Sequence, residues 1–190
     1  GYPIITYFIA EHYLIYKEIN ITPGVDSIFR YYDILLENIP VKSLLTIFAT
    51  NNSFFLESEL TNIFEESFMI DTIMDFIRAY PYLFKRTLNR ISLIHDSFNT
   101  YLRNHITGYP ELEGKVNRFV QNSLLSGNIN FMSRLSSFEL SEDFYKEILL
   151  MYSQIDNFSA LLKRTLDFNS ITSFYGQLQK VLEKREGVLD

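Results

Sequence analysis

Long runs of helical periodicity, interrupted by few Gly and Pro residues, constrain this chain more than any other feature of its sequence. Seven Gly and five Pro occur in 190 residues, and they fall between stretches in which apolar residues recur every three or four positions. β-hairpins would need turn residues at much shorter intervals. The sequence therefore predicts an all-α fold of eight or nine helices, packed as antiparallel hairpins because the breaks between helices are short.

The expected helices differ in how clearly they are marked. They cover residues 4–19, 23–39, 41–50, 59–68, 71–80, 83–106, 111–125, 141–166 and 169–182. The longest stripe runs from Leu83 to Ile106, and Ser141 ahead of two carboxylates is a clear helix start. Residues 126–141 give no clear pattern. Apolar residues on more than one side of most helices favour an elongated bundle or a short helical solenoid.

The length fits one domain, residues 1–190, with a possible subdivision near residues 107–111, where TGYPE combines Gly and Pro. The initial Gly suggests a fragment of a longer protein. Glu11 and His12 interrupt the most apolar run, residues 2–16, which is too short to span a bilayer and lacks the features of a signal peptide. These features favour an intracellular location.

Motifs for catalysis or cofactor binding are missing. The chain has no Cys, which excludes thiolate metal sites, disulfides and a cysteine nucleophile. Phosphate-binding glycine loops and a nucleophile elbow are absent, and His12, His95 and His105 have no metal-ligating partner three or four residues away. We therefore expect no cofactor and, most simply, no catalytic activity.

The net charge of the chain limits the kinds of partner that we expect. The net charge of −6 argues against nucleic acid as the main partner, because phosphate contacts need clustered Lys and Arg. The acidic stretch from Glu65 to Asp75 lacks a Ca²⁺-loop pattern and is expected to be a solvated face. A local basic surface remains compatible with this composition.

Two stretches share the letters KRTL: LFKRTLNRIS at residues 83–92 and LLKRTLDFNS at residues 161–170. The similarity does not extend outward, so it does not define a repeat family. One interpretation is an amphipathic helical turn with exposed cations and with Thr and Leu facing inward. The other is a pair of basic patches that bind an acidic partner, formed by Lys85, Arg86, Arg90, Lys163 and Arg164.

Aromatic residues are the richest remaining signal. Seventeen Phe and thirteen Tyr make up 16% of the chain, and Tyr31–Tyr32 and Phe54–Phe55 place rings at adjacent positions. Adjacent helical positions cannot all face one core strip. These rings are expected to pack against a second layer, to form an interaction groove that contacts a partner, or to line a small-molecule pocket.

Three functions follow in order of preference. The first is a protein-interaction or scaffold module that binds another polypeptide. The second is a ligand-sensing, dimerising helical domain, because MDFIRAYPYLFKRTLNR at residues 74–90 loosely resembles a helix junction of tetracycline-repressor-type regulators. That resemblance implies a closed apolar cavity and a two-helix dimer face. The third is an enzyme whose site is assembled from dispersed carboxylates or His residues. Oligomeric state is not predicted.

Overall fold

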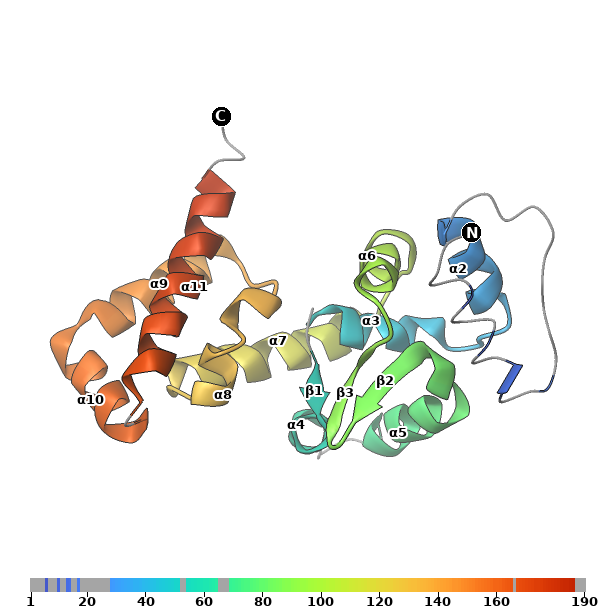
Figure 1. The fold of residues 1–190 in the computed structure, drawn as a ribbon, viewed down its shortest axis with the longest axis horizontal. Helices are drawn as coiled ribbons and strands as arrows, with labels where there is room; N and C mark the ends of the chain where they lie inside the picture. The colour runs from blue at the N-terminus through green and yellow to red at the C-terminus, as the bar shows by residue number, and fades with distance from the viewer. Residues whose placement is uncertain are drawn as a thin grey trace. The chain divides into compact units, whose positions relative to one another are not determined.

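The computed structural model describes residues 28–51, 54–64, 69–165 and 167–186, together with five single positions within the first seventeen residues. The helix expected at residues 4–19 lies outside these ranges. The chain divides into two compact units, residues 1–113 and residues 114–190, and each is described by itself (Figure 1). The expectation of one domain with a possible subdivision near residues 107–111 stays a prediction.

The first unit combines helices with a small sheet. The elements of its described residues, in chain order, are α2 (Ile28–Glu37), a 3-10 turn (Lys42–Leu44), α3 (Leu45–Ala49), β1 (Phe55–Leu56), α4 (Glu57–Phe64), α5 (Met69–Ala79), a 3-10 turn (Pro81–Leu83), β2 (Phe84–Thr87), β3 (Arg90–Leu93) and α6 (Asp96–His105). Helix α7 (Pro110–Leu125) begins in this unit and continues into the next.

Among its described residues, the elements of the second unit are α-helices and one 3-10 turn. After α7 it contains α8 (Ile129–Met132), a 3-10 turn (Leu135–Ser137), α9 (Glu142–Ser153), α10 (Ile155–Thr165) and α11 (Phe168–Glu186). Helix α8 and the 3-10 turn occupy the stretch for which the sequence gave no clear pattern.

The described part of the chain is mostly helical, as predicted, but contains ten α-helices rather than eight or nine. One extra helix arises where the helix expected at residues 141–166 is divided. Gln154 adopts an extended conformation with ψ 132°, and the Asn157 side chain donates to the Met151 carbonyl at 2.9 Å, which stabilises the corner. Arrangement of the helices as antiparallel hairpins, in a bundle or a solenoid, stays a prediction.

The expected long helix at residues 83–106 is wrong in its first half, which forms the hairpin β2–β3. Strand order in the sheet is β1-β3-β2, and both pairings are antiparallel. Within β3, Arg90 is exposed whereas Ile91 and Leu93 are buried, an alternation typical of a strand. The apolar steps from Leu83 to Ile91 fit a helix face, and they do not reveal that the chain reverses between Thr87 and Arg90 to form a hairpin.

The buried face of the sheet packs against α3. All five residues of α3 are buried, and the Phe48 ring lies edge-on to the rings of Phe84 and Phe55, at centroid distances of 4.9 and 6.0 Å. The outward face of the hairpin is thereby left for contact with solvent. This packing fixes the orientation of the hairpin within its unit.

The core of the second unit is built on α9 and α11. Ser141 caps α9 by accepting a hydrogen bond from the Phe144 amide at 3.3 Å, which confirms the predicted helix start. The buried Tyr152 ring lies edge-on to Phe174 at 5.7 Å. Its hydroxyl donates to the Leu124 carbonyl at 2.8 Å, so one side chain closes the end of α7 against α9.

Candidate functional site

A basic surface forms on the outward face of the hairpin at residues 84–93. Paired residues on neighbouring strands project from the same face of a sheet. The register pairs Lys85 with Ser92, and pairs Arg90 with both Thr87 and Leu56. The hairpin face is therefore made of Lys85, Thr87, Arg90, Ser92 and Leu56. It carries two cations and two hydroxyls around one apolar side chain.

The remaining cation of the hairpin, Arg86, lies at the end of the opposite face. It pairs with the Glu57 carboxylate at 3.6 Å, and both side chains are nearly half exposed. The Arg90 guanidinium lies over the Phe54 ring, 4.5 Å from its centroid, a distance suited to a cation–π contact. Phe54, just before β1, thus belongs to the same surface as Arg90.

Leu88 occupies the tip of the hairpin in an unusual conformation. Its φ is 56°, in the left-handed region that L-residues other than Asn and Asp rarely adopt, and its side chain is 96% exposed. Because the Leu88 side chain buries almost no apolar surface, it contributes little to the stability of the fold. Backbone outliers of this kind often mark functional surfaces.

Four of the predicted partner-binding residues are brought together here: Lys85, Arg86, Arg90 and Phe54. The other two cations, Lys163 and Arg164, lie at the exposed end of α10 in the second unit. The shared letters KRT thus form a strand in one unit and the last turn of a helix in the other. The expectation that Thr and Leu of this stretch face inward is wrong in the first unit, where both are exposed.

The remaining predicted aromatics, Tyr31, Tyr32 and Phe55, are buried in the first unit. The Tyr32 ring packs 4.9 Å from Phe98 on α6. Burial raises the pKa of Tyr31 to about 12, because the charged phenolate is disfavoured away from water. The adjacent rings near residue 31 are therefore explained by packing against a second layer.

The same interface between α2 and α6 holds polar groups. The Tyr101 hydroxyl donates to the Asp33 carboxylate, and burial, together with this carboxylate, raises the pKa of Tyr101 above its ordinary value. The Tyr101 ring also stacks on His105, with centroids 4.5 Å apart. The position of His105 is therefore explained by its packing against the Tyr101 ring.

His95 caps α6. Its Nδ1 accepts a hydrogen bond from the Ser97 amide at 3.1 Å, which requires an unprotonated Nδ1. The Ser97 hydroxyl lies 2.8 Å from the same nitrogen and 2.7 Å from the Tyr32 hydroxyl. The resulting chain of hydrogen bonds joins the start of α6 to the buried ring of Tyr32.

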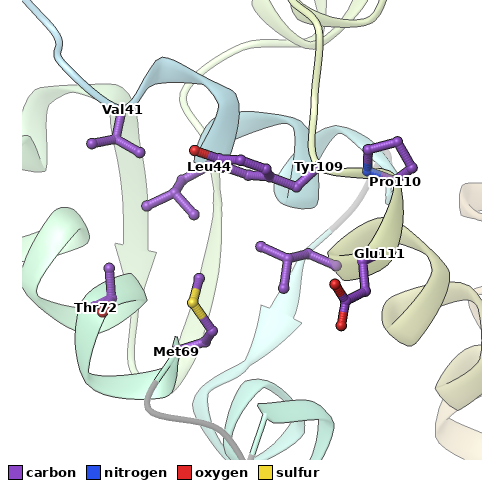
Figure 2. A pocket seen from close by; sticks show the side chains of 8 residues that line it. Val41, Leu44, Met69, Thr72, Tyr109, Pro110 and Glu111 are labelled. Carbon is purple, nitrogen blue, oxygen red and sulfur yellow. The ribbon is translucent and has the colours of Figure 1, made fainter.

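The first unit also contains an apolar pocket of about 600 Å³ (Figure 2). Eight residues line it: Val41, Leu44, Met69, Thr72, Tyr109, Pro110, Glu111 and Leu112. They come from the turn before α3, the start of α5 and the start of α7. The volume lies within the range of about 300–1,000 Å³ typical of small-molecule sites.

Sequence reasoning missed this pocket because its three contributing segments are far apart in the chain. Its residues share no spacing or motif that could join Val41 to Met69 or to Tyr109. The only local signal was TGYPE, which was interpreted as a break between helices. Its Pro110 instead starts α7 at the edge of the pocket.

Other candidate chemistry is sparse within the described ranges. Asp71 and Asp75 are exposed on α5, where Asp75 pairs with Arg78 at 2.7 Å; Glu65 and Glu66 lie outside the described residues. No group of three or more His, Asp or Glu residues in the described part could hold a metal ion. None of the described helices is long and apolar enough to cross a membrane.

Comparison with protein-family models, curated proteins and solved structures finds no match.

Proposed function

We propose that this chain is a protein-interaction module that binds an acidic polypeptide segment along the hairpin at residues 84–93. The observation that carries this proposal is the position of Lys85 and Arg90 on the outward face of one hairpin, with the exposed Leu88 at its tip. The chain as a whole has a net charge of −6. A concentrated basic surface in such a chain favours one place for an acidic partner over the rest of the molecule.

The edge position of β2 supports an extended partner. Among the described residues, β2 pairs only with β3. The Leu83 carbonyl accepts from the Ile94 amide at 3.1 Å, and in an antiparallel ladder this register turns the backbone of Arg86 toward the outer edge. A segment added alongside β2 would direct acidic side chains at Lys85 and Arg90, in the manner of strand addition.

The energies involved predict weak binding that depends on salt. An exposed ion pair contributes about 0.2–1 kcal/mol, so two such pairs, at Lys85 and Arg90, contribute roughly 0.4–2 kcal/mol. Burial of the Leu88 side chain adds about 1.5–3 kcal/mol. Association itself costs at least about 4 kcal/mol in lost freedom, so a tight partner would need further contacts.

The test uses two synthetic peptides of alternating sequence, Val-Glu and Val-Lys, with NMR shifts of the protein as the readout. We expect the Val-Glu peptide to shift the amides of residues 84–93 and the Val-Lys peptide to leave them unchanged. The double variant Lys85→Glu/Arg90→Glu should abolish Val-Glu binding, and raising the salt concentration should weaken it. The matched control is Lys163→Glu/Lys180→Glu, which makes the same charge change in the second unit.

Equal weakening by the control would mean that general charge, and not the hairpin, attracts the peptide, and the proposal would fail. Because the hairpin double variant could also disturb folding, the neutral pair Lys85→Gln/Arg90→Gln should be compared with it. Its thermal midpoint should fall by no more than a few degrees, because Arg90→Gln removes the contact with the Phe54 ring, while its binding is clearly reduced. Unchanged binding in a folded neutral variant would also reject the hairpin.

The pocket supports a second candidate function, that of a ligand-sensing domain. Its apolar lining and its volume of about 600 Å³ suit a small molecule. Native mass spectrometry of the purified protein should then detect a copurified small molecule or a dimer. A bare monomer that also fails to bind apolar probes at the pocket would argue against this function.

A further inference from the structure

We propose that the pocket in the first unit binds a small molecule that carries an ammonium group on an apolar body. This inference depends on the second candidate function, ligand binding at the pocket, and adds the chemical class of the ligand. It is independent of the proposed peptide surface on the hairpin. The inference is argued from the apolar lining of the pocket and from the charge at its mouth.

The apolar body follows from the walls. Leu44, Met69 and Leu112 line the interior, and Val41 and Pro110 complete the apolar part of the lining. Figure 2 shows Leu44 above Met69, with Val41 and Thr72 to the left of them. A ligand group that fills this space loses contact with water, so alkyl or aryl groups are favoured.

The ammonium group follows from Glu111, which is the only charged side chain among the eight lining residues. Glu111 is exposed, so its carboxylate lies where the pocket meets solvent. Tyr109 is also partly exposed and presents an aromatic ring to the same pocket. A carboxylate and an aromatic face together are the groups that recognise alkylammonium ions.

The start of α7 could instead attract an anion, since the free amides of a helix N-terminus are positively polarised. Here, however, the first turn already carries two carboxylates, Glu111 and Glu113. An anionic ligand would approach both of them. The local field therefore favours a cation over an anion at this end of the pocket.

The experiment compares three probes with the same alkyl chain: hexylamine, 1-hexanol and hexanoate, titrated at pH 7 with protein NMR as the readout. We expect hexylamine to bind about three- to ten-fold more tightly than 1-hexanol, the range for a partly exposed charge pair with a cation–π contact. Hexanoate should bind most weakly. Glu111→Gln should remove most of the preference for hexylamine, leaving only the contribution of the Tyr109 ring, and should leave 1-hexanol unchanged.

Two further variants separate the possible explanations. Glu37→Gln removes the same charge at the exposed end of α2, at a residue that does not line the pocket, and should leave the preference for hexylamine intact. Val41→Trp should fill the pocket and weaken all three probes. Probe binding that survives this substitution in a folded protein would overturn the location.

The possible outcomes separate a failure of the proposed ligand class from a failure of ligand binding at the pocket. If hexylamine and 1-hexanol bind equally, the pocket binds ligands but the proposed class is wrong. If Glu37→Gln lowers hexylamine binding as much as Glu111→Gln does, net charge explains the preference and the inference fails. If no probe binds, both the inference and the ligand-binding function fail.

Discussion

The guanidinium of Arg90, in β3, lies 4.5 Å from the centre of the Phe54 ring, which precedes β1. This contact joins the first edge of the sheet to its central strand. It also orients one of the two cations on the outward face of the hairpin. The stability of the sheet and the shape of the basic surface therefore depend on the same pair.

We expect Arg90→Ala to lower the free energy of unfolding by about 0.5–1 kcal/mol, the usual contribution of an exposed cation–π pair. Phe54→Leu should lower it as well. The double variant should lose less than the sum of the two single variants, because each substitution already removes the same contact. Urea unfolding of the four proteins measures this coupling; strictly additive losses would show that the pair does not interact.

Leu88→Asn should stabilise the protein by about 0.5–1 kcal/mol. Leu in the left-handed region is disfavoured by roughly 1–2 kcal/mol, Asn tolerates it better, and the Leu88 side chain is almost fully exposed. The matched control is Leu150→Asn, which changes an exposed Leu within α9 and should destabilise slightly through helix propensity. Thermal unfolding measures both; the same sign for both variants would contradict the strain at Leu88.

Gly108→Ala should destabilise the first unit by about 1–3 kcal/mol, the usual effect of overpacking. An added Cβ would lie 2.2 Å from the hydroxyl oxygen of Thr46, a short and buried side chain that cannot swing aside. The control Gly176→Ala has open space around the new Cβ within α11 and should stabilise by up to about 1 kcal/mol. Chemical denaturation of both variants tests the pair, and a neutral Gly108→Ala would refute the close approach.

Stability should fall as the pH rises above 10. Tyr31 has a folded pKa of about 12 against an ordinary value of 10.0, so between these values the unfolded chain has released a proton that the folded chain still holds. The free energy of unfolding then decreases with pH, by up to about 1.4 kcal/mol per pH unit for each such group. Tyr31→Phe should show a shallower decline in urea titrations at pH 8, 10 and 11. An unchanged slope would contradict the raised pKa.

The helices with local start signals could be predicted from the sequence. Ser141 and the carboxylates after it specify the start of α9, and Pro110 occupies the first position of α7. The hairpin could not be predicted in this way. Its central strand is held by Phe55, which is paired with Ile91 from more than thirty positions away. A contact at that separation leaves no trace in a local apolar period.

Some features of the candidate sites could also be predicted from the sequence, whereas others could not. Lys85, Arg86 and Arg90 attract notice in the sequence as a cluster of cations, although they lie on a sheet and not on the expected helix. Adjacent rings at Tyr31 and Tyr32 suggested surplus aromatic surface, yet both are buried against α6 or its neighbours. The pocket needed the fold to bring three segments together.

The outer edge of β2 has one further consequence, for contacts between identical molecules. An exposed strand edge is a template for pairing with another copy, which is a common start of aggregation. Two copies meeting at this edge would bring Lys85 and Arg86 of each molecule against those of the other. Their mutual repulsion opposes such pairing at low ionic strength, so the same charges that would attract an acidic partner also disfavour pairing of two copies at this edge.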